Sequence, residues 1–362
     1  MNSTKKILIA NRGVIAIRAL RAAKELGYQV ASVYSTADKN LKHLKLSDEA
    51  ICIGPPDSKD SYLNEAAIIS AAELANVDGI YPGYGFLSEN AEFAEKCKNS
   101  GFKFIGPSHE IISLMGDKIQ AKNLMRQLGV PVVPGYEGPV ESKEQIEDEV
   151  KKVGLPVIIK AAAGGGGRGM RIVRELSELW DAIEDARSEA NAAFGSDLVF
   201  IERYLEKPRH VEIQIFGDGK GNAVHLFSRD CSLQRKYQKV IEEAPAINIP
   251  DEKINEIYQI SVNACCELNY EGAGTLEFLY ENGEFFFIEM NTRIQVEHTV
   301  TEMITGVDLV QAQLELAMND VYNFDQSKIK INGHAMQCRI NAEDPNSFVP
   351  SPGRIMQIHR PG

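Results

Sequence analysis

Polar and apolar residues alternate in the stretch IEMNTRIQVEH, residues 288–298. If this stretch stays extended, one of its faces carries every second residue, namely Glu289, Asn291, Arg293, Gln295 and Glu297. The segment that leads into it, EFFFI, is apolar on both faces, as in a strand that is covered on both sides. Polar side chains next to a covered strand must be paired or ligated, because burying a bare charge is costly. The pattern therefore favours a binding site, and the alternative is a solvated face of a sheet.

A further carboxylate precedes this stretch in a predicted hairpin, TLEFLYENGEFFFIEMN (275–291), whose turn is ENG. Glu277, in the first strand of the hairpin, could add its carboxylate to the face that carries Glu289 and Asn291. All three side chains offer hard oxygen donors. Because Mg²⁺ is typically held by one or two carboxylates together with the phosphates of a substrate, the hairpin is a candidate magnesium site.

A glycine-rich stretch, KAAAGGGGRGM (160–170), follows the apolar run PVIIK. Lys160 ends that run, where a charged group needs a partner and a phosphate would suit; Lys118 opens a predicted helix in GDKIQA. Solvent exposure is the simpler interpretation of both lysines. The glycine spacing is not that of a Walker A motif, and on its own it is compatible with a mobile linker. Together with the carboxylate hairpin, it indicates a loop whose N–H groups fold over nucleotide phosphates.

The elements that must position these groups differ between the two halves of the chain. In the first half, short apolar runs alternate with helical periodicity, which predicts a parallel, doubly wound sheet and an α/β fold. The first turn, N-R-G-x-I-A, lacks the G-x-G-x-x-G fingerprint, so no dinucleotide site is predicted there. The predicted strands are 5–10, 29–35, 50–54, 79–85 and 102–106, and the predicted helices are 14–27, 66–77 and 91–101.

From about residue 135 the pattern changes to strands joined by glycine-rich turns, which predicts an α+β region with antiparallel pairs. A helix that opens in GDKIQA and is stopped by Gly129 and Pro131 precedes this region. From about Ile331 a further β-rich segment begins, and the sequence ends within it. The predicted strands are 153–160, 171–175, 198–205 and 210–227, and the predicted helices are 175–194 and 251–268.

The composition limits the class of protein and of partner. The 362 residues are 44% hydrophobic and 25% charged, as in soluble globular proteins of two or three domains. The net charge of −12 argues against a nucleic-acid-binding surface. No apolar run approaches the roughly 20 residues of a membrane span, and the N-terminal run ILIA is too short for a signal peptide.

Cysteine usage points to the cytoplasm. Six cysteines without a C-x-x-C pair predict reduced thiols rather than a disulfide framework. Cys231 is a possible nucleophile, but a buried structural cysteine is the favoured interpretation.

Several long motifs together resemble biotin carboxylase, a member of the ATP-grasp superfamily and the component that performs the first half-reaction of acetyl-CoA carboxylase. The resemblance runs from about Lys5 to the end of the sequence. Motifs of this length and specificity make coincidence negligible. They are IANRG, YPGYGFLSEN, KAAAGGGGRGM, ERYLEKPRHVEIQ, RDCSLQR, EEAPA, EMNTRIQVEH and CRINAEDP.

The resemblance implies three domains. A Rossmann-like N-terminal domain without a dinucleotide is expected over residues 1–115, and an ATP-grasp domain over 116–330, with a glycine-rich lid at about 131–205. Residues 331–362 would begin the β-rich C-terminal domain. In the family that domain continues well beyond HRPG and normally contributes to a homodimer contact. We therefore expect a C-terminally short member, homodimeric if that domain is complete.

The reaction that the resemblance implies turns ATP, bicarbonate and biotin into ADP, phosphate and carboxybiotin by way of carboxyphosphate, and serves fatty acid biosynthesis. Mg²⁺ or Mn²⁺ would be held by Glu277, Glu289 and Asn291. The glycine lid would be disordered without nucleotide and ordered with it. The implied nucleotide contacts are Lys118, Lys160, Gly166, Gly167, Glu202, Arg203, Tyr204, Leu205, His210, Gln234, Tyr237, Glu277, Leu279 and Glu289.

The resemblance also implies a bicarbonate and biotin site. Glu297 would be the base that deprotonates bicarbonate, kept ionised by the neighbouring cation of Arg293. Arg339 would stabilise the enolate of biotin, and Tyr84 would lie near biotin. Bicarbonate would be held by Lys239, Arg293, Gln295 and Val296, with Arg339 also in the substrate site.

The sequence has no biotin-attachment motif E-A-M-K-M, so biotin is expected on a biotin carboxyl carrier protein, with carboxyltransferase subunits as further partners. Three alternatives are a truncated nucleotide-binding pseudoenzyme, the corresponding subunit of a pyruvate or propionyl-CoA carboxylase, and another ATP-grasp ligase. RIQVEH together with QCRIN disfavours the last of these. The chain departs from the family pattern at Val14 and Ser228, where glutamates are usual, and at Tyr237, where histidine is common.

Overall fold

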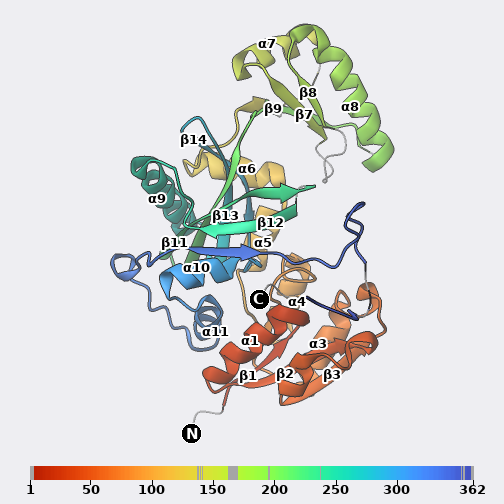
Figure 1. The fold of residues 1–362 in the computed structure, drawn as a ribbon, viewed down its shortest axis with the longest axis vertical. Helices are drawn as coiled ribbons and strands as arrows, with labels where there is room; N and C mark the ends of the chain where they lie inside the picture. The colour runs from red at the N-terminus through yellow and green to blue at the C-terminus, as the bar shows by residue number, and fades with distance from the viewer. Residues whose placement is uncertain are drawn as a thin grey trace.

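The computed structural model describes residues 4–136, 138, 140, 142–161, 170–194, 196–236, 238–351, 353 and 355–359, without the side chains of residues 161, 193 and 194. Its strands form three sheets that follow one another along the long axis of the molecule (Figure 1). The five-stranded sheet lies at one end, the six-stranded sheet in the middle, and a smaller four-stranded sheet at the other end.

The five-stranded sheet is parallel throughout and has its first strand in the centre, which confirms the predicted doubly wound arrangement. Along the central strand, Ile7 and Ile9 face one hydrophobic core and Leu8 faces another, so both faces are covered. The strand order is β3 (Glu49–Gly54), β2 (Gln29–Ser35), β1 (Lys6–Ile9), β4 (Gly79–Tyr81) and β5 (Lys103–Phe104). The helical segments are α1 (Gly13–Glu25), η1 (Thr36–Asp38), α2 (Lys42–Leu46), η2 (Ser58–Asp60), α3 (Glu65–Ala75) and α4 (Ala91–Asn99).

The six-stranded sheet is antiparallel and carries the two predicted hairpin strands at one edge. Its strand order is β14 (Glu284–Asn291), β13 (Glu271–Glu281), β10 (Arg209–Asp218), β11 (Ala223–Arg235), β12 (Gln238–Ala244) and β15 (Ala335–Cys338). Three helices contribute to the hydrophobic core on one face of this sheet, namely α5 (His109–Gly116), α6 (Lys118–Gln127) and α9 (Asp251–Glu267).

The two faces of this sheet differ in chemistry because side chains alternate along each strand. On β10, Val211, Ile213 and Ile215 belong to the core with α5, α6 and α9. The intervening residues His210 and Glu212 therefore lie on the other face, and Glu212 is fully buried there. That second face is where the candidate site lies.

The smaller sheet forms a separate lobe with its own hydrophobic core, in which Ile146 and Val150 pack on Val157 and Ile201 (Figure 1). Its strand order is β6 (Gly135–Tyr136), β9 (Val199–Arg203), β7 (Val157–Ala161) and β8 (Arg171–Val173). Its helical segments are α7 (Lys143–Val153), η3 (Leu176–Glu178) and α8 (Leu179–Phe194).

The stretch 288–298 is not extended throughout, so the expected single polar face is wrong beyond Asn291. The strand β14 ends at Asn291, the chain turns, and Glu297 becomes the N-cap of α10 (His298–Thr305). Ile294 and Glu297 are both buried, at 0% and 2% exposure. The chain turns because an apolar and a polar residue of this stretch are both buried, in different surroundings. Ile294 enters the core of the five-stranded sheet, whereas Glu297 faces the cation of Lys239.

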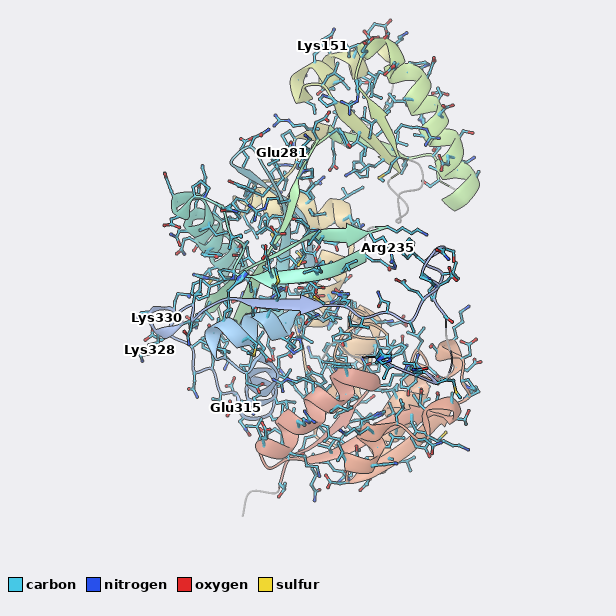
Figure 2. The ribbon with its side chains drawn as sticks, viewed as in Figure 1. Lys151, Arg235, Glu281, Glu315, Lys328 and Lys330 are labelled. Carbon is cyan, nitrogen blue, oxygen red and sulfur yellow. The ribbon has the colours of Figure 1, made fainter. Side chains whose placement is uncertain are left out.

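The C-terminal segment joins the six-stranded sheet at its far edge. β15 pairs with β12, with Gln337 opposite Glu242, and the backbone N–H of Arg339 donates to the carbonyl of Val240 at 2.9 Å. Arg235, at the end of β11, extends toward the segment after β15 (Figure 2), where its Nη1 lies 2.7 Å from Oε1 of Glu343. The remaining helical segments are α11 (Leu309–Asn319), which shares a core with α1, and η4 (Gln326–Lys328).

Candidate active site

A row of charged side chains crosses four adjacent strands of the six-stranded sheet. Arg229 on β11 is opposite Glu212 on β10, and Glu212 is opposite Glu277 on β13. Glu277 is in turn opposite Glu289 on β14. Residues directly opposite one another in antiparallel strands share a face, so three carboxylates lie side by side. Such a row requires cations, because adjacent like charges repel.

Lys239 supplies one of these cations from β12. Its Nζ lies 2.9 Å from Oε1 of Glu277 and 2.7 Å from Oε1 of Glu297, and it also forms an ion pair with Glu212. Burial would raise the pKa of Glu277, but His210 and Lys239 hold that pKa below its ordinary range. Lys239 therefore binds together carboxylates from three separate segments of the chain.

Glu297 lies between two cations. Lys239 contacts its Oε1, and Nη2 of Arg339 donates to its Oε2 at 2.9 Å. Burial alone would raise the pKa of Glu297, but the charges of Lys239, Arg229 and Arg339 hold that pKa below its ordinary value. Glu297 is thus a buried carboxylate that stays ionised at neutral pH, as a base must be.

Glu277, Glu289 and Asn291 share one face because Asn291 lies two residues beyond Glu289 on β14. Nδ2 of Asn291 donates to Oε1 of Glu277 at 2.8 Å. Burial and the charge of Glu277 raise the pKa of Glu289, and Nζ of Lys118 is 3.9 Å from its Oε2. The side chain of Glu289 is 42% exposed, so it is a half-buried carboxylate whose charged form is disfavoured by Glu277. Together with the amide oxygen of Asn291, the two carboxylates form a donor set that fits Mg²⁺.

Arg293 and Gln295 follow in the turn after β14. Nε2 of Gln295 donates to Oε1 of Glu277 at 2.8 Å, and Nη2 of Arg293 donates to Oδ1 of Asn291 at 2.7 Å. The turn thereby brings both side chains to the carboxylate row, although they are not on a strand. Val296 lies in the same turn, next to Glu297.

Lys160 meets Glu202 across two strands of the smaller sheet. Its Nζ lies 2.5 Å from Oε2 of Glu202, and Lys122 of α6 forms an ion pair with the other oxygen. Burial and the charge of Lys118 lower the pKa of Lys160 to about 8. Two lysines around one buried carboxylate leave positive charge for phosphate groups.

The apolar and ribose contacts expected for a nucleotide are grouped on nearby strands. Leu205 and Leu279 pack in one small cluster with Val133. His210 and Gln234 lie beside it, with Nδ1 of His210 at 3.0 Å from Nε2 of Gln234.

Other predicted nucleotide residues are less closely associated. The backbone N–H groups of Arg203 and Tyr204 bond to the carbonyls of Pro134 and Pro156, and the guanidinium of Arg174 lies 5.8 Å from the ring centre of Tyr204. The side chain of Lys118 is 67% exposed. Gly166, Gly167 and Tyr237 lie outside the described residues, as does the expected change of order in the glycine loop.

The N-terminal sheet reaches the site through the loop after β4. Nδ2 of Asn11 donates to the carbonyls of Pro82 and Tyr84, at 2.7 and 2.9 Å, and so joins the IANRG and YPGYG motifs. Burial raises the pKa of Tyr84, and the charges of Arg339 and Glu297 act on it in opposite directions. Tyr84 therefore lies within electrostatic range of the proposed base. Sites at the carboxyl ends of parallel strands are typical of such sheets.

Sequence reasoning missed Glu212, Arg229 and Glu242, all three fully buried in or beside this site. Arg229 donates to Oε1 of Gln214 at 2.7 Å and to Oγ1 of Thr301 at 2.9 Å, besides its ion pair with Glu212. His210, Glu212 and Gln214 alternate with apolar residues in HVEIQ, which is the same pattern as in β14. This pattern would have indicated Glu212 and Gln214, two of the partners of Arg229.

Cys231 is fully buried, and burial raises the pKa of its thiol far above the ordinary value. A thiol that resists ionisation is a poor nucleophile. The structural interpretation of Cys231 is confirmed.

Two of the departures from the family pattern lie outside the charged row. Val14, near the start of α1, is 78% exposed. Ser228 is buried, lies 2.9 Å from the hydroxyl of Tyr258, and accepts from the N–H of Ala246 at 3.2 Å. The polar group at position 228 is therefore satisfied by its own neighbours.

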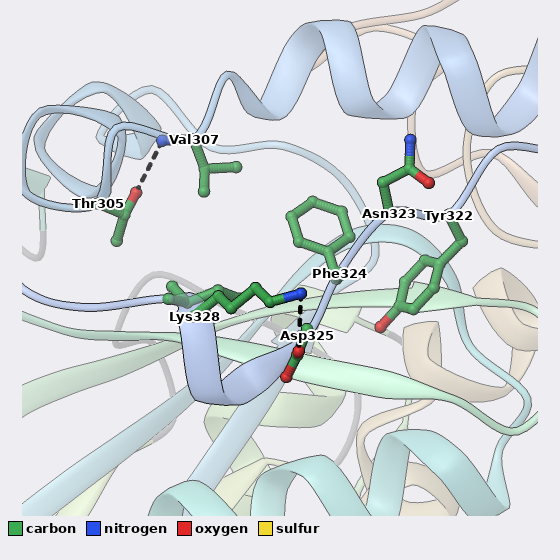
Figure 3. Close-up of a pocket in the computed structure, with 8 residues that line it drawn as sticks. Thr305, Val307, Tyr322, Asn323, Phe324, Asp325 and Lys328 are labelled. Atoms are coloured by element: carbon green, nitrogen blue, oxygen red, sulfur yellow. Dashed lines mark hydrogen bonds and ion pairs between the residues drawn. The ribbon is translucent and has the colours of Figure 1, made fainter.

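A separate hollow of about 470 Å³ lies beside α10 and η4 (Figure 3). Asp325 and Lys328 in its wall pair with each other at 3.2 Å, and Oγ1 of Thr305 accepts from the N–H of Val307. Within the described part of the chain, no sequence-predicted site residue lines it. It is not part of the candidate site.

The chain matches known proteins over nearly its whole length. Residues 3–112 match the family model "Biotin carboxylase, N-terminal domain", and residues 117–323 match "Carbamoyl-phosphate synthase L chain, ATP binding domain". The chain is 59% identical to the biotin carboxylase of Haemophilus influenzae, over 99% of this chain and 80% of the relative.

Two solved structures are similar over 99% of this chain. One is a biotin carboxylase–β,γ-ATP complex from Campylobacter jejuni, with a TM-score of 0.89, 50% identity and 80% of that chain covered. The other is the biotin carboxylase domain of the Hydrogenobacter thermophilus 2-oxoglutarate carboxylase, with MgADP, ADP and bicarbonate. Its TM-score is 0.88, at 46% identity and with 79% of that chain covered.

A search of the described residues finds no helix with the length and apolar character needed to span a membrane.

Proposed function

Because the chain belongs to the biotin carboxylase family, we infer that it carboxylates biotin with bicarbonate and converts ATP to ADP and phosphate. The observation that supports this most directly is the position of Glu297, an ionised and buried carboxylate between Lys239 and Arg339. The reaction needs three groups in one place: a base (Glu297), a lysine that binds an anion (Lys239) and an arginine that can face an oxyanion (Arg339).

In the first step Glu297 takes the proton of bicarbonate, which is a poor nucleophile until that proton leaves. Lys239 and Arg293 hold the resulting carbonate, and one of its oxygens attacks the γ-phosphorus of ATP to give carboxyphosphate and ADP. Catalysis of phosphoryl transfer is mostly positioning and charge neutralisation. Lys160 and Lys118 are the cations that the chain itself offers to the phosphates.

Glu277, Glu289 and Asn291 would hold the divalent cation. When bound, Mg²⁺ neutralises the charge of the phosphates. On the other side of the row, Lys239 pairs with Glu277 and Arg229 pairs with Glu212, and these contacts hold both carboxylates in place.

In the second step carboxyphosphate breaks down into carbon dioxide and phosphate. The released phosphate takes the proton from N1 of biotin, and N1 attacks the carbon dioxide to give carboxybiotin. Arg339 would face the ureido oxygen of biotin, where negative charge develops as the nitrogen loses its proton. A guanidinium can donate two hydrogen bonds in one plane to such an oxygen. Tyr84, within electrostatic range of Arg339, would form the wall beside biotin.

We further propose the division of the chain at about residues 115 and 330. The two family models support the first boundary, since one ends at residue 112 and the other begins at residue 117. The second model ends at residue 323, a few residues before the second boundary. The segment after residue 330 would belong to the C-terminal domain of the family, with β15 joining it to the six-stranded sheet.

Biotin comes to this family on a carrier, which is therefore the expected partner. We propose a biotin carboxyl carrier protein and the carboxyltransferase subunits of acetyl-CoA carboxylase. The chain is also similar to a domain of a 2-oxoglutarate carboxylase. This similarity supports a second candidate function, in which the chain is the biotin carboxylase subunit of another biotin-dependent carboxylase. A homodimer is also proposed for a chain with a complete C-terminal domain, and sedimentation of the purified protein would test it.

The proposed function is tested by phosphate release from ATP with purified protein, Mg²⁺, bicarbonate and free biotin. We expect release that requires both bicarbonate and biotin. ADP formation that is indifferent to both would rule out the proposal. Nucleotide binding without any turnover would instead support the pseudoenzyme alternative.

A further inference from the structure

Glu89 is a carboxylate of the N-terminal part of the chain that contacts the candidate site. It lies in the loop between β4 and α4. Its Oε2 accepts from Nε of Arg293 at 2.7 Å, and its Oε1 accepts from the backbone N–H of Thr292 at 3.3 Å. One carboxylate thus holds two consecutive residues of the turn that follows β14.

The guanidinium of Arg293 is fixed in three directions. Besides Nε to Glu89, Nη2 donates to Oδ1 of Asn291 at 2.7 Å and Nη1 donates to the carbonyl of Ile294 at 3.3 Å. A guanidinium is a rigid planar fork, so three acceptors determine its plane and the direction of its remaining N–H groups. Asn291 and Ile294 lie within two residues of Arg293 in the sequence, whereas Glu89 is 204 positions away. Glu89 is therefore an anchor that the turn does not provide for itself.

The loop that carries Glu89 is itself held in place. The side chain of Asn11 donates to the carbonyls of Pro82 and Tyr84, at 2.7 and 2.9 Å. Oδ1 of Asn90, the next residue, accepts from the N–H of Phe93 at 2.8 Å and caps α4. Glu89 can position Arg293 because its own backbone is fixed on both sides.

Glu89 also shares a cavity with the candidate phosphate and metal residues. This cavity of about 270 Å³ is lined by Glu89, Lys118, Glu289, Asn291 and Arg293, among others. A negative charge there opposes the binding of anionic substrates. Attraction of substrate therefore cannot explain Glu89, whereas orientation of Arg293 can.

We propose that Glu89 is a positioning residue that sets the guanidinium of Arg293 for bicarbonate. The proposal depends on the proposed function, in which Arg293 holds that anion. Glu89 acts through Arg293 and has no contact with the reacting atoms. Because the side chains of Glu89 and Arg293 are 40% and 22% exposed, their ion pair contributes little to stability, and variants are expected to fold.

The kinetic test compares Glu89→Ala, Glu89→Gln and Glu92→Ala. Glu92 of α4 is 73% exposed, so its variant is a control with the same change of charge. Glu89→Ala should raise the KM for bicarbonate about tenfold, since a small displacement of a binding group has effects of this size or larger. The KM for ATP should not rise, because the lost charge is negative, and the Mg²⁺ requirement should stay the same. Glu89→Gln keeps one acceptor oxygen and should restore part of the loss, and Glu92→Ala should behave like the parent protein.

An unchanged KM for bicarbonate, equal shifts for bicarbonate and ATP, or a shifted Mg²⁺ requirement would each overturn the proposal. Crystal structures of the parent and of Glu89→Ala supply a readout that needs no turnover. We expect the guanidinium of Arg293 to adopt a different orientation in the variant. If its orientation is unchanged, so that Asn291 alone holds it in place, the proposed role of Glu89 is refuted. If the parent shows no bicarbonate-dependent ATP cleavage while Arg293 moves in the variant, the proposed function fails and the positioning of Arg293 by Glu89 is upheld.

Discussion

Arg339 and Glu297 are joined by an ion pair in which Nη2 of Arg339 lies 2.9 Å from Oε2 of Glu297. Arg339 follows β15 and Glu297 precedes α10, so the contact depends on the pairing of β15 with β12. The proposed base for bicarbonate and the proposed partner of biotin are thus direct neighbours. Under the proposed function, the carbonate that Glu297 generates and the biotin that faces Arg339 would therefore meet in one place.

Glu297→Gln should abolish turnover while leaving nucleotide binding intact. The amide has the size of the carboxylate but cannot take a proton from bicarbonate. Loss of a general base typically lowers the rate by about 10²–10⁴-fold. The measurement is bicarbonate-dependent phosphate release beside ADP affinity by calorimetry. A variant that retains more than about a tenth of the parent rate would show that another group is the base.

The depressed pKa of Glu297 predicts where activity declines in acid. The base must be ionised, so kcat/KM per bicarbonate ion should hold until the pH falls below the ordinary glutamate value of roughly 4.3. Lys239→Met removes the strongest cation acting on Glu297 and should move this decline to higher pH. The same depressed pKa stabilises the fold above the unfolded-state value and ceases to do so as the pH falls through the folded-state value. A decline at the same pH in parent and variant would contradict the assignment.

The fold was predictable where a short run of apolar residues marks a covered strand. Ile7, Leu8 and Ile9 indicate a strand covered on both faces, and the structure places them in two cores. The hairpin around ENG was predictable from its turn and flanking apolar runs. These features depend on residues close together in sequence.

The assembly of the site was not predictable from alternation. The row from Arg229 to Glu289 requires the register of four strands, which tertiary packing sets. Glu297 reaches the row through a turn and a helix cap rather than along β14. Lys239 and Arg339 were found through the family resemblance alone, since neither lies in a local pattern that marks a site.

Magnesium should stabilise the protein through Glu289. Burial and the charge of Glu277 raise the pKa of Glu289, and a bound cation removes that destabilisation. With ADP present, Mg²⁺ should raise Tm, because a ligand that binds the folded state stabilises it. Glu289→Gln should lose most of this rise. Glu284→Gln is the matched control and should keep the rise, because Glu284 lies at the other end of the same strand, away from Glu277. A full Mg²⁺ response in Glu289→Gln would exclude Glu289 as a ligand.

Arg229→Met should destabilise the fold more than any surface charge variant. Arg229 and Glu212 have side chains that are 0% exposed, and removal of one partner leaves Glu212 with fewer donors in the interior. Breaking such a pair costs about 3–5 kcal/mol. Part of that cost will be offset here, because Lys239 also pairs with Glu212. The free energy of unfolding in urea measures the effect.

Lys220→Met provides the comparison, because Lys220 and Asp320 are 60% and 69% exposed and such pairs contribute about 0–1 kcal/mol. The double variant Arg229→Met with Glu212→Met should recover part of the loss, since it leaves no buried carboxylate at position 212 that has lost one of its cations. If Arg229→Met and Lys220→Met cost the same, Arg229 does not hold the carboxylate row. If the double variant is less stable than Arg229→Met, Glu212 stabilises the site through Lys239 and His210 instead.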